Sequence, residues 1–498
     1  MATRAGDRGR AHEDDESVLH RLGYAQELVR TMGGFSNFAI SFTIISILAG
    51  CLTSYFIAFN NGGPVAVTWG WLLVGAFCTI VAFAMSELAS AMPTAGGLYY
   101  WASKLGSPVW GWFTGWFNLV GQIAVTAAID YGAAVFLNSL LNLLFGVSTS
   151  PTAIFITYTA ILVLHGLINT FGVQLVGMLN SISAWWHMVG VVVIVAVLIF
   201  VPDQHQSASF VFGIGLLMAQ YTITGYDASA HLAEETHNAS RAAAYGIILS
   251  VVVSVFFGFI LLVAVTFAVP DVQGTLDAAA TAVTYIWQES MGTSWAVFLL
   301  FIAVVAQLFC GMASVTSASR MLFAFSRDGA VPGHSLWRQV GRDGVPVKSV
   351  WVICTLSWLL MVPTLANPAV GYLVGTSIAV IGLYLAFVLP IFLRLRAGDS
   401  FEPGQFSLGR HYRWIDALAI AWIALICILF LMPTVPAGIP GSADFDWNVF
   451  NFAPLTVGGA LILFGGWWLV SANRWFKGPV RQGSEEELAR IEAAKTTA

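Results

Sequence analysis

The stretch AQYTITGYDASAHLAEETHNASR, residues 219–241, interrupts a chain that is otherwise strongly apolar. The runs before and after it are apolar enough to cross a membrane, yet its middle contains Thr-Gly-Tyr-Asp, followed by two histidines and two glutamates. A polar group in the hydrocarbon of a bilayer costs free energy unless it has a partner or water. The polar residues of this segment therefore need partners inside the protein, or an opening to water.

The overall composition is that of a membrane protein. Of 498 residues, 58% are hydrophobic and only 9% are charged, whereas a typical soluble domain is about 25% charged. Twelve apolar runs are long enough for membrane-spanning helices, which need roughly 20 residues each. They predict an all-α polytopic membrane protein with twelve transmembrane helices, near residues 34–58, 65–92, 109–141, 152–170, 176–201, 210–233, 243–269, 293–325, 349–366, 369–393, 413–433 and 452–472.

Charge and cysteine usage exclude other classes of protein. The net charge of −5 is spread over tails and loops without a basic block, so we expect no nucleic-acid partner. All five cysteines lie in apolar runs, where we expect small buried hydrophobic residues instead of a disulfide framework. No spacing of histidines, cysteines and acidic residues fits a metal site, and we expect no cofactor.

The distribution of Lys and Arg predicts the orientation in the membrane. Basic residues follow every even-numbered apolar run except the fourth, whereas the connections after odd-numbered runs are poor in them. In membrane proteins the cytoplasmic loops carry the excess of Lys and Arg. We therefore expect a multi-pass protein of the cell membrane with two cytoplasmic tails, residues 1–32 and 475–498.

Two of the apolar runs share a defect. The first contains SILAGCLTS, residues 46–54, and the sixth contains TITGY, residues 222–226. Each holds a glycine, Gly50 or Gly225, beside small hydroxyl residues, and the two runs stand five apart. Interrupted hydrophobic segments at corresponding positions of two halves indicate a transporter's binding site. The alternative is that each glycine only allows close packing of helices.

Several long segments are similar to one family of membrane proteins. They are GGFSNFAISFTIISILAG in the first run, AMSELASAMPTAGGLYYWASKLG after the second, NSISAWWHMVG in the fifth, GYDASAHLAEETHNASRAAAYGI in the sixth and SASRMLFAFSRDGAVPGH after the eighth. Through them the chain resembles the amino acid–polyamine–organocation permeases, and within these the amino acid/choline transporter branch. The resemblance implies a leucine-transporter-type fold, with an inverted repeat of five plus five helices at residues 33–202 and 208–396 and two C-terminal helices at residues 411–474.

The resemblance also implies a function. The expected protein is not an enzyme but a secondary active transporter, which imports an amino acid or a small amine such as 4-aminobutyrate by alternating access and is driven by protons. The alternatives are an uncoupled amino acid or amine exchanger, a choline or polyamine permease and, outside transport, a nutrient sensor. The expected partners are thus a small-molecule substrate, the proton and the lipid bilayer, with Na⁺ as an alternative coupling ion.

The resemblance places the substrate between the two interrupted helices. The N-terminus of a half-helix presents N–H groups to a carboxylate, and the carbonyls that end the other half accept from an ammonium. The carboxylate site carried over consists of Ala49, Gly50, Cys51, Leu52 and Thr53, and the amine site of Thr222, Ile223, Thr224, Gly225 and Tyr226. Many relatives have a Gly-small-Gly triplet at the first break. Here Cys51 and Leu52 leave less room, which keeps open a substrate such as 4-aminobutyrate or choline.

Further polar residues are candidates for substrate contact. Tyr221, just before the second break, is expected either to cover the substrate as an aromatic gate or to pack among other aromatic residues. Asn118, Gln122 and Thr126 recur every four residues and share one helical face. We expect Asn118 and Gln122 either to contact the substrate or to hydrogen-bond to neighbouring helices.

Asp227, directly after the second break, is a candidate for proton coupling. A carboxylate inside the membrane must be neutral, paired or hydrated. It is expected to carry a proton or meet an amine, or else to form a structural ion pair. The residues that follow are assigned structural roles at the cytoplasmic exit: His231, Glu234, Glu235 and His237.

His187, in the middle of the fifth run, is the second candidate for proton coupling. In some proton-coupled members of the family, a cationic residue of this helix occupies the place of a sodium ion. The alternative is a neutral histidine that bonds to the backbone or to Ser183. Sodium coupling stays open because hydroxyls of the eighth run are available as ligands: Ser314, Thr316 and Ser317.

Overall fold

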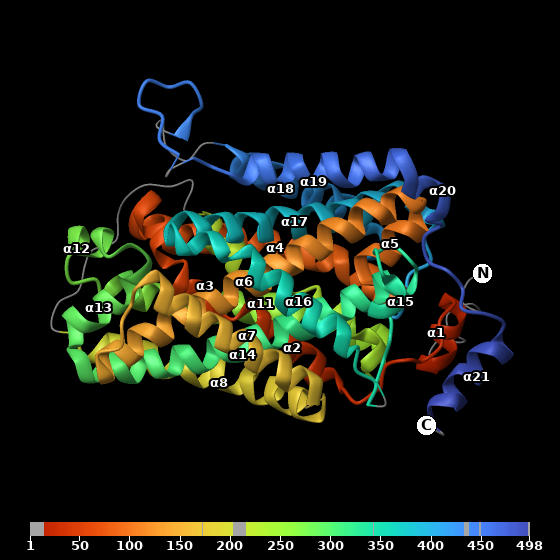
Figure 1. Cartoon of the computed structure of the whole chain (residues 1–498), viewed down its shortest axis with the longest axis horizontal. Coiled ribbons are helices and arrows are strands. Elements are labelled where there is room, and N and C mark those ends of the chain that lie inside the picture. Colours follow the sequence, from red (N-terminus) through yellow and green to blue (C-terminus); the bar gives the residue numbers. More distant parts are fainter. Residues whose placement is uncertain are drawn as a thin grey trace, which may run out of the picture.

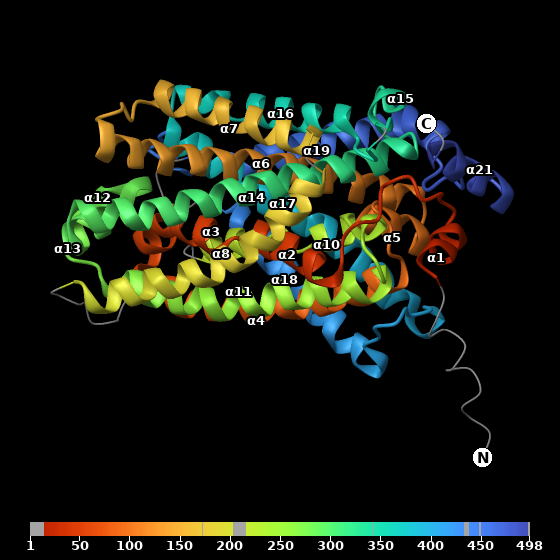
Figure 2. The same cartoon turned by 90° about the horizontal axis from the view of Figure 1, so that it is seen from below.

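The computed structural model describes residues 14–171, 173–202, 216–341, 343–432, 438–447 and 450–496. Within these ranges the chain is helical and contains no β-strand, with one isolated parallel bridge between Met32 and Thr236. Long helices run side by side along the molecule (Figures 1 and 2). The predicted all-α polytopic architecture is confirmed.

Eleven helices in the described ranges are long and apolar enough to cross a membrane. The helices that form these spans are α2 (Gly34–Ile45) with α3 (Ile47–Thr53), α4 (Tyr55–Ala91), α6 (Pro108–Phe145), α7 (Pro151–Phe171), α8 (Val173–Phe200), α11 (Ala239–Phe267), α14 (Thr293–Arg327), α16 (Val347–Leu360), α17 (Pro368–Ala397), α18 (Tyr412–Leu431) and α19 (Ala453–Trp467). The remaining predicted run, residues 210–233, begins outside the described ranges and continues as the short helices α9 (Leu216–Thr222) and α10 (Ala228–His231). The count of twelve and the repeat boundaries therefore stay predictions.

Shorter elements connect the spans. The α-helices among them are α1 (Asp15–Leu22), α5 (Gly97–Leu105), α12 (Val272–Asp277), α13 (Ala282–Met291), α15 (His334–Trp337), α20 (Asn473–Trp475) and α21 (Glu485–Thr496). Single turns of other helix types are η1 (Ala233–Glu235), η2 (Ala279–Thr281), η3 (Val362–Leu365), η4 (Gly398–Ser400), η5 (Gly409–His411) and η7 (Trp468–Ala472). Inside α4, Gly63 leaves the helical conformation just before Pro64, so residues 55–62 extend the first span and residues 64–91 form the second.

The packing of the spans separates buried helices from lipid-facing ones. The central helix α6 packs against α14 and α17, and α4 packs against α11. By contrast, α19 lies on the outside of the bundle, and only 11% of its membrane window is buried. Large apolar side chains there, such as Ile462, are exposed. In a bilayer this exposure is favourable because lipid tails replace water.

The helices α1, α5, α15 and α21 gather at one end of the bundle, here called the terminal face (Figures 1 and 2). Three buried ion pairs tie the spans together toward this end: Arg394–Glu87 at 2.8 Å, Arg327–Glu234 at 2.9 Å and Arg320–Glu235 at 2.7 Å. Each places a guanidinium against a carboxylate on a different element. The terminal face is therefore closed by paired charges in this structure.

Both tails dock on one carboxylate of the terminal face. The hydroxyls of Tyr24 and Tyr99 donate to Oδ2 of Asp328, at 2.7 and 2.9 Å, and the backbone N–H of Val480 donates to Oδ1 at 3.0 Å. Burial raises the pKa of Asp328 to about 6, although neighbouring Arg327 and these donors act in the opposite direction. The ionised carboxylate is thus less favourable here than in an unfolded chain.

The raised pKa of Asp328 predicts a pH-dependent stability. Because the folded-state pKa lies above the usual pKa, near 4, the protonated group stabilises the fold at low pH. This contribution, at most about 3 kcal/mol, is lost as the pH rises through about 6. Thermal unfolding of the purified protein should show a lower midpoint at pH 7.5 than at pH 5. Asp328→Asn should remove this difference, whereas Asp399→Asn, at an exposed carboxylate, should retain it. If the unfolding midpoint of Asp328→Asn changed between pH 5 and pH 7.5 as much as that of wild type, Asp328 would not be the group responsible.

Candidate functional site

The first span is interrupted at Ser46. This residue has φ of 37°, ends α2, and begins α3 with its side-chain oxygen accepting from the N–H of Ala49 at 3.2 Å. Gly50 lies inside α3 and is helical. The break therefore falls within the predicted segment, residues 46–54, but four residues before the predicted glycine.

The second interruption separates α9 from α10. Gly225 lies in this interruption with φ of 100°, a backbone conformation that residues other than glycine rarely adopt. A Cβ atom at this position would also lie 2.3 Å from Cγ2 of Ile44, which belongs to the first span. Gly225 is thus required both by the turn of the chain and by the close approach of α2.

Hydrogen bonds join the two interruptions. The Ser41 hydroxyl on α2 donates to the carbonyl of Tyr226 at 3.0 Å and accepts from the N–H of Ser229 at 2.9 Å. On the other side, α3 packs closely on α9, because a Cβ atom at Gly50 would lie 2.6 Å from Oγ1 of Thr222. Gly50 therefore allows two helices to pack closely, which was the alternative to a break of the helix at this glycine.

A small cavity lies between the two interruptions. Its lining comes from the first, third, sixth and eighth spans: Ile44, Ile45, Ala49, Gly50, Thr53, Val125, Ile129, Tyr221, Thr222, Thr224 and Cys310. The space left between these side chains is about 10 Å³, close to the least that holds one water molecule. A larger ligand requires movement of the surrounding helices or side chains.

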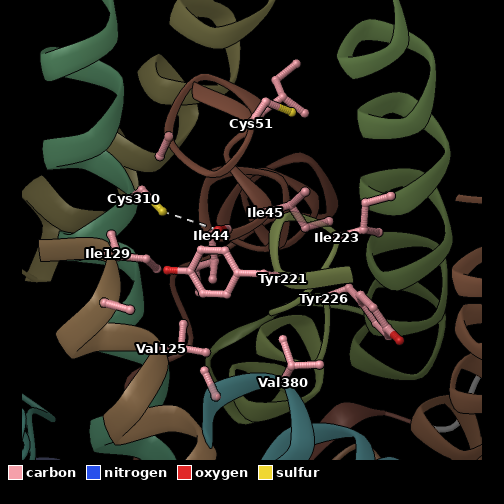
Figure 3. Packing of buried hydrophobic residues seen from close by; sticks show 14 of the residues in the cluster. Ile44, Ile45, Cys51, Val125, Ile129, Tyr221, Ile223, Tyr226, Cys310 and Val380 are labelled. Carbon is pink, nitrogen blue, oxygen red and sulfur yellow. Dashed lines mark hydrogen bonds between the residues drawn. The ribbon is translucent and has the colours of Figure 1, made fainter. Parts of the chain in front are cut away.

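The cavity brings together part of the predicted site. The predicted residues in its lining are Ala49, Gly50, Thr53, Tyr221, Thr222 and Thr224. Figure 3 shows the Tyr221 ring directed toward Ile129 and Cys310, while Tyr226 points the other way. Tyr221 thus forms part of the cavity wall, among apolar side chains.

Other predicted residues are buried around the cavity but do not line it. These are Cys51, Leu52, Ile223, Gly225 and Tyr226. The α3 residues that line the cavity, Ala49, Gly50 and Thr53, share one side of this helix, and Cys51 and Leu52 are not among them. Tyr384 of α17, which the sequence did not single out, bonds to the second break, where its hydroxyl donates to the carbonyl of Ile223 at 3.0 Å.

The cavity lining contains hydroxyls but no charged side chain among the described residues. The Thr53 hydroxyl donates to the carbonyl of Ala49 at 2.8 Å and lies 3.2 Å from the Tyr372 hydroxyl. The hydroxyls of Thr222 and Thr224 donate to carbonyls of α9. A charged ligand would therefore depend on backbone dipoles and on hydroxyl oxygens for its partners.

Asn118 and Gln122 lie away from the cavity. Their amide groups both donate to Oδ2 of Asp227, at 3.2 and 2.8 Å. The next residue on this helical face, Thr126, hydrogen-bonds to Ser314 of α14 at 2.7 Å. The polar face of α6 thus bonds to other helices, which was the alternative to substrate contact.

Asp227 is completely buried and has a third partner. Nε2 of His231, also completely buried, lies 3.3 Å from Oδ2 of Asp227, and Nδ1 of His231 lies 2.9 Å from the carbonyl of Ala95. His231 therefore belongs to the surroundings of the second break rather than to an open exit. The glutamates that follow it, Glu234 and Glu235, are the ones held by arginines of α14.

His187 of α8 contacts the first break. Its Nε2 lies 2.6 Å from the Ser46 hydroxyl, and its Nδ1 lies 2.8 Å from the carbonyl of Ser183. A carbonyl only accepts, so Nδ1 carries a hydrogen and a neutral ring can accept from Ser46 at Nε2. Both nitrogens are thus satisfied without an additional proton.

Among the hydroxyls considered as sodium ligands, that of Thr316 donates to the carbonyl of Met312.

The close contact of α3 with α9 predicts a stability effect. Gly50→Ala should overpack the contact with Thr222 and lower the free energy of unfolding by about 1–3 kcal/mol. Combining it with Thr222→Ala should restore part of the loss, because the clashing atoms are removed. Thermal unfolding of the purified protein measures both. Gly177→Ala, at a helical glycine with open space, is the matched control and should be neutral. A neutral Gly50→Ala would contradict the contact.

Comparison with known proteins agrees with this architecture. A family model described as amino acid permease matches residues 32–461. The chain is 38% identical to the amino-acid permease BAT1 homolog of Oryza sativa subsp. japonica, over 95% of this chain and 96% of the relative. It is 37% identical to the amino-acid permease BAT1 of Arabidopsis thaliana, over 93% and 95%. It is 27% identical to a GABA-specific permease of Saccharomyces cerevisiae, over 97% and 88%.

The family match covers most of the chain and confirms the resemblance found in the sequence. Relatives in this family are permeases, so the expectation of a transporter rather than an enzyme is confirmed as well. Together with the membrane-spanning helices, it identifies a multi-pass membrane protein. The chain belongs to the amino acid permease family.

Proposed function

We propose that the chain is a secondary active transporter that imports an amino acid or a small amine such as 4-aminobutyrate by alternating access. The observation that carries this is the pair of interrupted spans that meet around one small cavity. Broken helices deep in a membrane bundle offer backbone groups to a substrate without charged side chains. The N-terminal end of α3 would receive a carboxylate, and the carbonyls at the end of α9 an ammonium.

The lining of the cavity favours a zwitterion with no additional charge. Ile44, Ile45, Val125 and Ile129 form apolar walls, and a second substrate charge would stay unpaired among them. This ranks polyamines below neutral amino acids and 4-aminobutyrate. Cys51 and Leu52, from which crowding is expected, do not line the cavity in this arrangement. The relative named a GABA-specific permease makes 4-aminobutyrate a substrate worth testing.

The terminal face is proposed to be cytoplasmic, as the distribution of Lys and Arg predicts. Substrate released to this side would have to pass the region held by the buried arginine–glutamate pairs. Opening then requires these pairs to separate, while the opposite side closes. In this proposal, spans 1, 2, 6 and 7 of the five-plus-five inverted repeat rock against the remaining spans.

Proton coupling is part of the proposal, with Asp227 and His187 as its residues. Each contacts one of the two interruptions, so a change of charge at either would act on the substrate region directly. A sodium-coupled transporter and an uncoupled exchanger are the alternatives.

Uptake into proteoliposomes tests the function. The panel comprises alanine, glutamate, 4-aminobutyrate, choline and spermidine, each with a pH gradient or with a sodium gradient. We expect a neutral amino acid or 4-aminobutyrate to accumulate under a pH gradient that is acidic outside, and no response to sodium. His187→Ala should weaken the accumulation.

Three outcomes would contradict the proposal. If accumulation depended on the sodium gradient and not on the pH gradient, the coupling ion would be Na⁺ and not the proton. Counterflow in the absence of any gradient-driven accumulation would indicate an exchanger. If His187→Ala accumulated substrate to the wild-type level, His187 would have no role in proton coupling. Empty liposomes and the addition of a protonophore serve as controls.

A further inference from the structure

Asp227 and His231 form a buried pair at the beginning of α10, immediately after the second break. Oδ2 of Asp227 and Nε2 of His231 lie 3.3 Å apart, and neither side chain is exposed. This is within ion-pair distance, although the ring is not aligned for a full hydrogen bond to the carboxylate. The neighbours of the two side chains bear on how many protons the pair holds.

The second ring nitrogen of His231, Nδ1, bears on the number of protons that the pair holds. Nδ1 of His231 faces the carbonyl of Ala95 at 2.9 Å, and a carbonyl only accepts, so Nδ1 carries a hydrogen. In a neutral imidazole, Nε2 is then an acceptor. It faces Oδ2 of Asp227, which is also an acceptor when the carboxylate is ionised. Two acceptors facing each other in a buried site repel, and one additional proton on either group removes the repulsion.

The amide donors indicate where that proton resides. Asn118 and Gln122 both donate to the same oxygen of Asp227 that faces the ring. An oxygen that receives two donors is most favourable as a carboxylate oxygen, so the proton belongs on His231. The pair is then an imidazolium beside a carboxylate, with no net charge.

No other charge replaces this proton in the described part of the chain. The elements packed against α10 are α2, α5, α11, α14 and η1. The glutamates of η1, Glu234 and Glu235, are neutralised by Arg327 and Arg320 of α14. Helix α2 has no titratable residue. Tyr226, which precedes Asp227 in the chain, donates its hydroxyl to that of Tyr384.

The cations of α5 and α11 are also directed elsewhere. Lys104 of α5 lies over the ring of Tyr100, and Arg241 of α11 lies over the ring of Tyr245. Tyr99 of α5 donates to Asp328. Among the described residues, His231 is therefore the cationic partner of Asp227.

We propose that Asp227 and His231 together bind the one proton that is moved with the substrate, and that His231 carries it. The inference rests on the proposed function. With the proton in place, Asp227 keeps its two amide donors on α6, and His231 of α10 keeps its bond to the loop before α5. When the imidazolium gives its proton to water, a neutral ring and an unpaired carboxylate remain, and the packed arrangement is no longer favourable. Movement of α10 or entry of water relieves the cost.

The same histidine connects this proton to the terminal face. The carbonyl of Ala95 accepts from His231, and the N–H of Ala95 donates to Oε1 of Glu234 at 2.9 Å. Glu234 is the partner of Arg327. A shift of the ring after proton loss thus displaces a residue that also supports one of the ion pairs that close this end.

The test uses His231→Asn in the full chain. The Asn side-chain N–H₂ can donate to the carbonyl of Ala95 in place of Nδ1, but the amide cannot hold a proton at neutral pH. Proteoliposomes with a difference of one pH unit and zero membrane potential are supplied with the compound of the panel that wild type accumulates. One proton per substrate allows at most about tenfold accumulation. His231→Asn should reach only equal concentrations on both sides, while keeping counterflow.

Two further variants complete the experiment. Asp227→Asn should behave as His231→Asn does, because a neutral amide facing a neutral ring needs no additional proton. His237→Asn is the matched control, at an exposed histidine six residues away, and should accumulate substrate as wild type does. A pH-sensitive dye inside the liposomes should report substrate-induced proton entry for wild type and His237→Asn, and none for the other two.

The outcomes separate this inference from the proposed function. Accumulation and proton entry at wild-type levels in His231→Asn would overturn the inference and leave the transporter intact. Loss of counterflow in both His231→Asn and Asp227→Asn would assign the pair a structural role and overturn it as well. Failure of the wild-type protein to move any compound of the panel would overturn the proposed function itself.

Discussion

The structure depends on one constraint: a helix that stops inside the membrane leaves backbone N–H and carbonyl groups that must find partners there. Side chains of the interrupted spans and of a neighbouring helix meet this constraint. Ser41 bonds to the far side of the second break, and Ser46 begins its own half-helix. Tyr384 reaches the break from α17. The surrounding spans are arranged around these bonds, because only a bundle that encloses both breaks keeps lipid away from them.

Polar contacts also determine how the terminal face is held. A buried ion pair is costly to form because both charges lose water, and its net contribution is small when the partners are well matched. The carboxylate of Glu87, for example, accepts from Arg394 and from the N–H of Leu408. Contacts of this kind are specific in the closed arrangement and are replaced by water when they separate. In the proposed transport cycle, such contacts would suit this end of the molecule better than a continuous apolar core would.

Part of this could be predicted from the sequence. Apolar length and composition were enough for the all-helical membrane architecture, and a glycine among hydroxyl residues located the second break at Gly225. The first break was placed only to within a few residues, since glycine marks both turns and close contacts. Gly50 turned out to serve a contact with Thr222, while Ser46 adopts the unusual backbone conformation. A serine with positive φ has no signature in a sequence.

The remaining features depend on contacts between distant segments. The apolar wall residues Val125 and Ile129 resemble every other valine and isoleucine of a membrane helix, so nothing in the sequence distinguishes them. His231 was assigned to the exit because charged residues follow it. Its burial depends on the loop at Ala95, which folds over it from more than a hundred residues away in the chain. Helical periodicity describes the face of one helix and contains no information on which loop covers it.

The near absence of free space in the cavity has a thermodynamic consequence. The arrangement described here has no room for a substrate, so binding of one requires a different arrangement of the same helices. Apparent affinity is then the intrinsic affinity reduced by the fraction of molecules in that arrangement. A protein that kept its cavity open would bind more tightly at equilibrium but would also release substrate more slowly. In the proposed transporter, the cost of opening the cavity would therefore lower the apparent affinity for substrate.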